Sequence, residues 1–421
     1  MGNRFRILCC ALLFAAPAWS AEETMPGANV ESLIELTRQQ NPELAVIRLE
    51  AEAASERIYP AGALPDPVLR TELRDITNKG TPDSPSLLPN QVGSTRYLVT
   101  QPIPFWGKRD LKKEMAEAEA SQANGRLAAT WSELSSRMKT AYAQYYLAAH
   151  SEKLTRELLD LVSGLEQTAQ ARYAIGLAQQ QDVIRAQVEQ TSMRGELLTL
   201  ETEHHHAMAR INALLRRAPS APLAEPQALR PLPTPARLEL ASLEERLRTN
   251  NPQLFILDAQ VAATGKNRDL VFKNRYPDFT LGISPIQNRS RFNEWELMFE
   301  LNIPLQQQTR RSQEREAGAM LDAAKARREA AQNQALADLA ESLFALRSAL
   351  RIESLNQKNL LPQAELTFES ALAGYETGKV DFATLLDAQR QIRKAKLDTL
   401  KAQIEAQMHL ADIEKLLGED I

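Results

Sequence analysis

Apolar residues recur along much of this chain at the spacing of helices that pack side by side. Leu154, Leu158 and Leu161 step by four and three, and the same spacing returns between Leu336 and Leu350. The 65 residues at 108–172 contain no proline, and at about 1.5 Å per residue they predict a rod of roughly 100 Å. The pattern predicts long helical hairpins.

Four shorter segments alternate between apolar and polar residues with the period of two that is typical of strands. They lie at residues 69–74, 95–103, 278–284 and 294–303, and Leu98 interrupts the alternation of the second. Runs of about eight to ten residues with one apolar face suit tilted strands that cross a bilayer. A half-buried strand of a soluble sheet is the alternative. The polar faces predict a surface that lines water, formed by Arg70, Glu72, Arg74, Glu294, Glu296 and Glu300.

The chain repeats its own order of elements. Asn41 and the proline after it return at Asn251, 210 positions later, and the segment that begins at Tyr173 returns at Tyr375, 202 positions later. Duplication on this scale predicts two structurally equivalent halves, each with short helices, two strands and a long helical hairpin. The predicted boundaries are a first repeat at 21–217, a Pro-rich connector at 218–238 and a second repeat at 239–421.

The N-terminal residues have the pattern of a secretory signal. Two arginines precede an apolar run at residues 7–16, and the small residues Ala18 and Ser20 occupy the two positions that a signal peptidase reads, which predicts a signal peptide at 1–20. A membrane anchor is the alternative, although the run is short of the roughly 20 residues that a spanning helix needs. Cys9 and Cys10 lie inside the predicted signal, so the exported chain would have no cysteine chemistry.

Composition narrows the classes of protein that remain. Beyond residue 20 the chain has no apolar stretch of about 18 residues, which argues against a membrane protein built of spanning helices. Its formal charge of −4 gives no indication of a nucleic-acid partner. Few aromatic residues, with many Ala, Glu, Leu, Lys and Arg, favour long helices.

The strand count decides the assembly. Four strands cannot close a barrel, and a sheet edge cannot lie open in hydrocarbon because every backbone group there needs a hydrogen-bond partner. Spanning strands must therefore be shared between copies. Side chains nearly fill the interior of an eight-stranded barrel, so a conducting pore favours three copies and twelve strands. The predicted fold is an α+β membrane protein, with a trimeric 12-stranded β-barrel continuous with a long α-helical tunnel.

The ends of the strands carry further expectations. The polar loops at 78–93 and 287–293 are expected to face the exterior, with the helices on the other side of the membrane. Aromatic residues flank the strands and predict a belt at the membrane interfaces, with ordinary packing as the alternative. These residues are Phe105, Trp106, Phe292 and Trp295.

Short motifs, in order and in both halves, resemble the TolC family of outer-membrane channel proteins. They comprise Asn-Pro at Asn41 and Asn251, Leu-Pro-Asp-Pro at 64–67, Gln-Pro-Ile-Pro at 101–104 before Gly107-Lys108-Arg109, and Tyr-x-x-Gly at 173–176 and 375–378. The resemblance covers essentially the whole chain beyond residue 20. Within the family, residues 101–109 are most similar to the heavy-metal efflux branch.

The resemblance implies a function and a set of partners. It implies a homotrimer in the outer membrane of a Gram-negative bacterium, whose tunnel crosses the periplasm to a periplasmic adaptor and an inner-membrane pump of the RND type. Such a channel conducts substrates passively, with heavy-metal cations as candidates, and is not an enzyme. An outer-membrane channel for type I protein secretion or drug efflux is one alternative, and a periplasmic coiled-coil scaffold is another.

The resemblance also assigns roles at the hairpin tips. Gly176 and Gly378 match the glycines of the helix-turn-helix tips that meet the adaptor, each followed by a candidate contact residue, Leu177 and Lys379. A tight helical reversal independently requires a residue that tolerates positive φ.

Three further positions match residues at the tunnel constriction. Asp387 matches one of two acidic positions that ring it, and Thr384 stands where the second would be, although Asp387 could equally be an ordinary solvated carboxylate. Asp182 matches an acidic tip residue that pairs with a basic partner in closed relatives. Val380 occupies the place of that partner, so this closing contact is not expected here.

Candidate metal chemistry is limited to His204-His205-His206. Consecutive helical residues point about 100° apart, so the three rings do not converge on one ion, and a solvated helix face is the preferred interpretation. No metal site, cofactor or catalytic residue is predicted.

Overall fold

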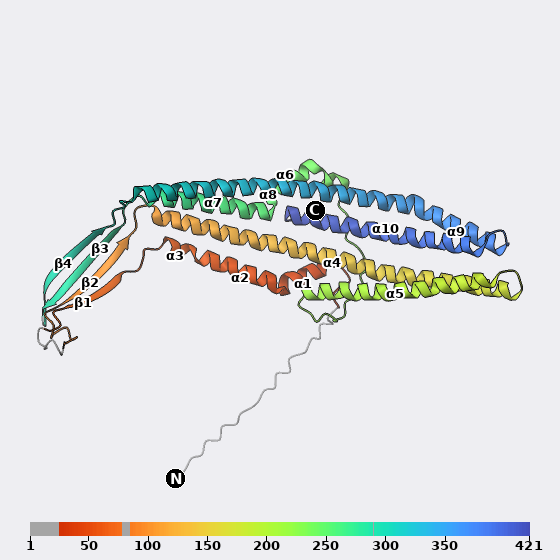
Figure 1. The fold of residues 1–421 in the computed structure, drawn as a ribbon, viewed down its shortest axis with the longest axis horizontal. Helices are drawn as coiled ribbons and strands as arrows, with labels where there is room; N and C mark the ends of the chain where they lie inside the picture. Colours follow the sequence, from red (N-terminus) through yellow and green to blue (C-terminus); the bar gives the residue numbers. More distant parts are fainter. Residues whose placement is uncertain (1–24, 78–84, 289) are drawn as a thin grey trace, which may run out of the picture.

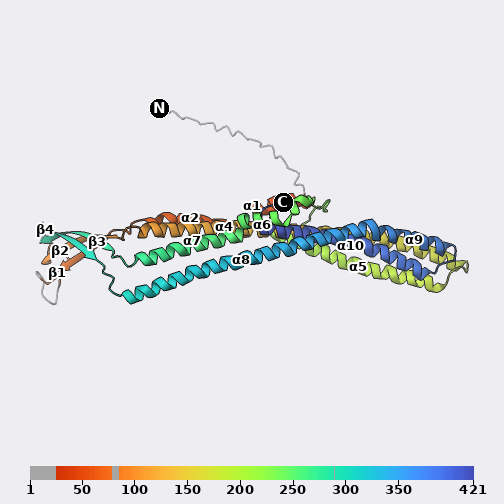
Figure 2. The same ribbon diagram turned by 90° about the horizontal axis from the view of Figure 1, so that it is seen from above.

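The computed structural model describes residues 25–77, 85–288 and 290–421, which form a long rod with a sheet at one end (Figure 1). The predicted signal peptide lies outside the described residues, as do residues 78–84 of the first predicted loop. The turns of both hairpins lie at the end opposite the sheet (Figures 1 and 2). The elements are α1 (Val30–Gln40), α2 (Pro42–Glu56), α3 (Ile58–Gly62), β1 (Val68–Arg74), β2 (Ser94–Ile103), α4 (Lys108–Ala174), α5 (Gln180–Leu214), η1 (Pro235–Leu238), α6 (Leu240–Asn250), α7 (Pro252–Lys273), β3 (Phe279–Asn288), β4 (Arg291–Leu301), α8 (Gln307–Leu355), η2 (Asn356–Leu360), α9 (Leu361–Glu376) and α10 (Phe382–Leu417).

The long helices follow from where proline occurs. Helix α4 continues for 67 residues because no proline interrupts its backbone hydrogen bonds. The sequence predicts a return helix at 182–217, and α5 matches it to within three residues at each end. In the second hairpin Pro362 has no N–H to donate, and the chain passes from α8 through the π-helical η2 into α9. No helix in the described part of the chain combines the length and apolar character needed to span a membrane.

One helix ends later than the sequence predicts. Residues 60–67 are rich in proline and predict a break in the helix at Pro60, but Pro60 lies inside α3, which runs to Gly62. Pro60 is in the first turn of this helix, where its missing N–H would have no helical partner in any case.

The repeated Asn-Pro pair has the same structural role in both halves. Asn41 Oδ1 accepts the backbone N–H of Glu43 at 2.9 Å, and Asn251 Oδ1 accepts that of Leu254 at 2.8 Å, so each asparagine caps the helix that starts at the following proline. Each Nδ2 donates to a carbonyl at the end of a return helix, at 3.0 Å for Asn41 and 2.7 Å for Asn251. One side chain thus joins two helix ends.

The two halves meet in a single antiparallel sheet of order β1-β2-β3-β4. Strand β3 runs to Asn288 and β4 begins at Arg291, so the predicted polar loop at 287–293 is wrong and the strands are longer. Pro285 lies opposite Trp295 of β4, whereas the β2–β3 pairing skips Pro285. Proline cannot donate a backbone hydrogen bond. Strand β3 therefore continues through Pro285 with its pairing to β4 intact and its pairing to β2 interrupted.

Apolar seams hold the helices together. The predicted leucine spacing in α8 is confirmed, since Leu339, Leu343 and Leu346 are at most 1% exposed and pack with residues of α6, α7 and α10. In α4, Tyr142 and Tyr145 are buried against α1 and α5. Desolvation raises the pKa of Tyr142 to about 12, and its hydroxyl lies 2.9 Å from the carbonyl oxygens of both Ala28 and Ala228.

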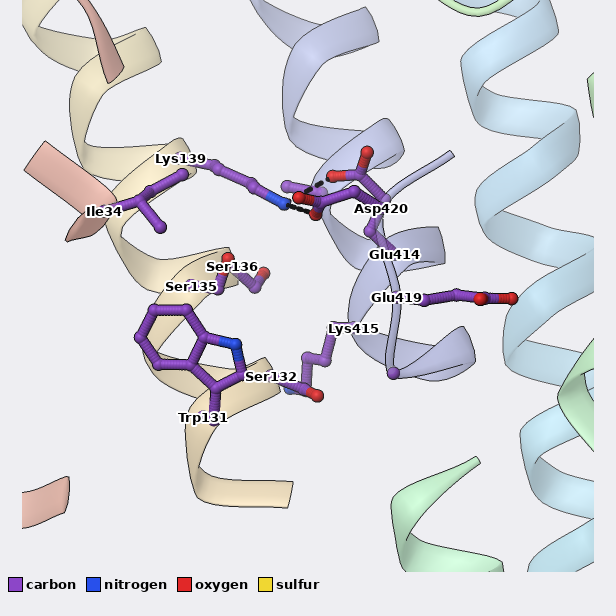
Figure 3. Close-up of a pocket in the computed structure, with 12 residues that line it drawn as sticks. Ile34, Trp131, Ser132, Ser135, Ser136, Lys139, Glu414, Lys415, Glu419 and Asp420 are labelled. Atoms are coloured by element: carbon purple, nitrogen blue, oxygen red, sulfur yellow. Dashed lines mark hydrogen bonds and ion pairs between the residues drawn. The ribbon is translucent and has the colours of Figure 1, made fainter. Parts of the chain in front are cut away.

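A buried ionic cluster joins α4, the connector and α10 near the C-terminus, and Figure 3 shows its residues Lys139, Glu414 and Asp420. Lys139 Nζ lies 2.8 Å from Glu414 Oε2 and also pairs with Asp420, and Arg230 donates to both carboxylate oxygens of Glu414 at 2.9 and 3.2 Å. The side chains of Lys139 and Glu414 are 4% and 3% exposed. Because both charges are desolvated, each depends on its partner.

Replacement of Glu414 should therefore destabilise the fold. Glu414→Gln leaves Lys139 and Arg230 short of a buried counter-charge, and we expect a loss of about 3 kcal/mol in the free energy of unfolding. Urea unfolding of the purified protein, followed by circular dichroism, measures the loss. Glu405→Gln, an exposed position on the same helix, is the matched control, and an equal effect of the two variants would contradict the prediction.

Candidate functional site

The register of the sheet gathers charges on one face. Arg96 of β2 lies 2.8 Å from Glu296 of β4 and 3.6 Å from Glu72 of β1, and its Nε donates to Ser284 Oγ of β3 at 3.0 Å. One side chain therefore links all four strands, and it is 18% exposed. Arg96 is absent from the predicted site residues, and its place in the alternation of β2 was the signal that could have indicated it.

The six predicted water-lining residues lie on β1 and β4, the two edge strands. The strand register places these residues on the same face of the sheet as Arg96. Glu72 lies directly opposite Arg96 on the neighbouring strand. Glu294 lies opposite Ile286, which in turn lies opposite Arg96. Arg70, Arg74, Glu296 and Glu300 follow by alternation. Among the described ion pairs of one chain, only those of Arg96 connect the charged residues of β1 with those of β4.

Leu98 does not interrupt the strand. Its side chain alternates regularly onto the charged face, where it is 3% exposed and packs over Gly282. A Cβ at Gly282 would lie 3.1 Å from Leu98, so glycine at this position makes room for the leucine.

The opposite face of the sheet is apolar and exposed. Its large side chains include Trp295, Leu297 and Phe299 of β4, at 69%, 86% and 65% exposure. At the helical end, Trp106 packs edge-on against Phe279 with ring centroids 5.7 Å apart, and Phe105 stacks on Tyr276 at 4.6 Å. At the far end, Phe292 lies 6.1 Å from Tyr97. Of the four predicted aromatic residues, Phe105 and Trp106 thus lie at the helical end, Phe292 lies at the far end, and Trp295 lies within β4.

A single ion pair anchors the start of α4 to the start of β3. Lys108 Nζ donates to Asp278 Oδ1 at 2.8 Å and to the carbonyl of Tyr276 at 3.0 Å, and the same carboxylate oxygen accepts the N–H of Phe105 at 2.8 Å. Desolvation alone would raise the pKa of Asp278, but the bonds from Lys108 and Phe105 outweigh it and hold this pKa below its usual value.

Both hairpin tips turn at a glycine with left-handed backbone. Gly176 has φ of +75° and Gly378 has φ of +73°, and the N–H of the following residue returns 2.8 Å to a carbonyl in the last helical turn. Leu177 is 63% exposed at the first tip. The two tips contact each other, because Arg172 donates to the carbonyl of Glu376 at 2.7 Å and lies 5.1 Å over the ring of Tyr375.

The residues assigned to the constriction are dispersed around these tips. Asp182 lies in the first turn of α5. The pKa of Tyr375 is raised mainly by the burial of its own hydroxyl and, to a smaller extent, by the nearby Asp182 carboxylate. Thr384 donates its hydroxyl and its N–H to Asp381, the N-cap of α10, so its side chain is engaged locally. Asp387 is 65% exposed and lies 3.3 Å from Arg390.

Sequence reasoning missed the ion pairs between α5 and α10, the return arms of the two hairpins. Glu189 of α5 is 4% exposed and lies 2.6 Å from Arg390 and 3.8 Å from Arg393, both on α10. Arg393 also lies 2.9 Å from Glu196. The hydrogen bond to Glu189 raises the pKa of Arg390. No local motif indicates these pairs, since the partners are about 200 residues apart in sequence.

The histidine run is only partly a solvated face. His205 and His206 are exposed, but His204 stacks on Tyr145 with ring centroids 5.0 Å apart, and its Nδ1 lies 3.8 Å from Glu152. The interpretation of the run as a solvated face is therefore wrong for His204, because helix packing places this one ring against α4. The described residues contain no group of three His, Cys, Asp or Glu side chains positioned to hold a metal ion.

Solved structures of outer-membrane channels share the fold of this chain. The structure resembles the channel CusC with a TM-score of 0.79, at 19% identity over 94% of this chain and 93% of that one. It resembles the outer membrane protein VceC of Vibrio cholerae with a TM-score of 0.77, at 17% identity over 93% and 96%. At these identities the likeness establishes the fold.

Sequence comparison identifies the family. The model of the outer membrane efflux protein family matches this chain twice, over residues 33–215 and 243–419, and the chain therefore belongs to that family. It is also 26% identical to the cobalt-zinc-cadmium resistance protein CzcC of Cupriavidus metallidurans, over 99% of this chain and 100% of that protein.

The Lys108–Asp278 pair generates a pH-dependent stability. A depressed pKa in the folded state stabilises the fold above the ordinary aspartate pKa of about 3.9, and this contribution is lost as the pH falls through the folded-state value. Asp278→Asn should cost about 1 kcal/mol at pH 7, a modest figure because the carboxylate is 45% exposed. The difference from wild type should shrink below about pH 4.

Thermal midpoints between pH 3 and pH 8 measure this difference. Asp160→Asn, on an exposed position of α4, is the matched control and should leave the midpoint unchanged. A difference between wild type and Asp278→Asn that stays constant with pH would contradict the assignment.

Proposed function

We propose that three copies of this chain form an outer-membrane channel of a Gram-negative bacterium. Their sheets would join edge to edge into a 12-stranded barrel, and their helices would form a tunnel across the periplasm. The observation that carries this proposal is the four-stranded sheet, whose two faces are apolar and charged and whose edge strands β1 and β4 need partners in hydrocarbon. The two halves would act as an internal repeat that supplies equivalent walls.

In this assembly the charged face lines the lumen. Arg70, Glu72 and Arg74 of one copy would approach Glu294, Glu296 and Glu300 of the next, since they occupy opposite edges of the sheet. The joined edges would thus bring opposite charges together across the protomer boundary. Phe105 and Trp106 would lie at the periplasmic interface, and Phe292 and Trp295 would lie toward the outer one.

The helical end would meet the partner proteins. Gly176, Leu177, Gly378 and Lys379 lie at the outermost point of the hairpins, where a periplasmic adaptor linked to an inner-membrane pump of the RND type could dock. Conduction would be passive, with no bond made or broken. Asp182, Thr384 and Asp387 would surround the narrow part of the tunnel, held closed by the pairs of Glu189 with Arg390 and Arg393.

Heavy-metal cations are the proposed substrates. The support is the full-length similarity to a cobalt-zinc-cadmium resistance protein. The pump would select the cation, and the barrel would need only a hydrated polar path. Export of drugs or of proteins by a type I system uses the same architecture and is the competing function.

Conductance tests the channel directly. Purified wild-type protein in a planar bilayer should give discrete current steps, and Glu189→Gln should raise the mean open fraction about fivefold because it removes the buried acceptor of Arg390. Glu157→Gln, exposed on α4, is the matched control. Absence of steps in both wild type and Glu189→Gln, across pH and salt, would contradict the proposed channel.

Metal tolerance tests the substrate. A strain that lacks this chain should lose growth on cobalt, zinc or cadmium salts, and a copy of the wild-type gene should restore it. Unchanged metal tolerance together with new sensitivity to organic drugs would overturn the metal assignment and favour drug efflux.

A further inference from the structure

Basic residues gather where the long helices meet the sheet. Residues 108–114, 266–278 and 306–315 contain eleven Lys and Arg against five Asp and Glu, whereas the whole chain has 50 against 54. These segments are the start of α4, the end of α7 with its link to β3, and the start of α8 (Figure 1). They are adjacent in space, as Lys266 lies 2.6 Å from Glu114 and Arg275 lies 2.6 Å from Glu314.

Internal pairs use only part of this charge. Lys108, Lys266 and Arg275 each have a carboxylate partner. Lys112 and Arg311 are exposed. The charge of Lys112 contributes to the lowered pKa of Asp278, whereas no ion pair of Arg311 occurs within the described residues. Lys273 Nζ lies 3.2 Å from the carbonyl of Trp106, a neutral acceptor that leaves its charge uncompensated. An excess of cationic groups thus remains at the surface.

Lys273 lies beside the end of the apolar face, and Lys112 and Arg311 belong to the adjoining starts of α4 and α8. Trp106 is 73% exposed and packs against Phe279, whose ring in turn lies 5.9 Å from Phe299 on that face. Because Lys273 Nζ donates a hydrogen bond to the carbonyl of Trp106, its ammonium group lies next to the residue that carries the exposed indole. Tyr276, stacked on Phe105, adds a phenol at 42% exposure.

Aromatic rings at the end of an apolar surface, with lysine and arginine just beyond, match the headgroup layer of a membrane. The rings suit the boundary between acyl chains and water, and the cations suit phosphate oxygens, with which they form charge-assisted hydrogen bonds. A second copy of the chain would bring the same positive belt against itself, which is unfavourable. A free phosphate would leave the exposed indole uncovered.

We propose that Lys112, Lys273 and Arg311, with Trp106, form a binding surface for anionic phospholipid in the membrane leaflet that faces the helices. This inference rests on the proposed function, because it requires the sheet to span the membrane. Its consequence is that the lipid headgroups hold the sheet at a defined depth, so that the charged start of the tunnel stays in water.

Lipid binding to the full-length protein tests this surface. Native mass spectrometry in detergent, with phosphatidylglycerol and phosphatidylcholine of equal chain length in competition, should show at least about fivefold preference for phosphatidylglycerol. The triple variant Lys112→Gln, Lys273→Gln, Arg311→Gln should reduce this preference to near parity. Lys153→Gln, Lys394→Gln, Lys401→Gln removes the same charge from exposed positions of α4 and α10 and should keep the preference.

Three outcomes would overturn the proposal. They are no preference in wild type, equal loss in both triple variants, or displacement of phosphatidylglycerol by millimolar inorganic phosphate, which would indicate a simple anion site. Conductance in a neutral bilayer separates this proposal from the function. Current steps without lipid preference would refute the lipid surface alone, whereas absence of steps would refute the channel.

Discussion

Backbone hydrogen bonding at the two edges of the four-stranded sheet is the constraint on which the rest of this structure depends. Strands β1 and β4 present N–H and C=O groups with no strand partner in the described part of the chain, beside side chains as apolar as Leu297 and Phe299. Apolar surface of this extent requires a lipid or protein environment, and in lipid an unpaired edge is untenable. In the proposed assembly, joining edges between copies would answer both demands and would set the orientation of the helices that follow each strand.

A single copy of the chain has no large hydrophobic core within its described residues. Much of its packing consists of helix-to-helix seams, with small clusters such as that of Leu339 and Leu343 in place of one central core. Ionic contacts then connect parts that are distant in sequence. Lys139 and Glu414 join the first hairpin to the last helix, and Lys108 and Asp278 join the start of α4 to the sheet. These ion pairs fix the position of one long helix along another. Apolar contacts between two helices do not fix that position, because they are not directional.

The two halves carry the same elements but differ at their ends. Pro362 and the π-helical turn before it interrupt the second hairpin, whereas α4 is continuous. At the tips, Arg172 of the first hairpin reaches the backbone of the second, and Glu189 holds two arginines of α10. The contacts that hold one hairpin to the other therefore come from residues that differ between the two halves.

Sequence reasoning recovered the parts of the fold that depend on local periodicity. The proline-free stretch predicted α4, the leucine spacing predicted the buried face of α8, and the two glycines predicted left-handed turns. It failed where a neighbour far along the chain decides the outcome. Pairing with β4 carries β3 past Pro285, and the ring of Tyr145 draws His204 out of solvent.

By itself, the sequence determined the elements, their order and their duplication, because these follow from backbone chemistry and from repeating patterns of apolar residues. Only the tertiary structure decided which charges meet. Arg96 finds Glu72 and Glu296, and Glu189 finds Arg390, because strand register and helix packing bring together residues that are remote in sequence. The energy of an ion pair depends on distance and burial, and neither quantity exists until the chain has folded.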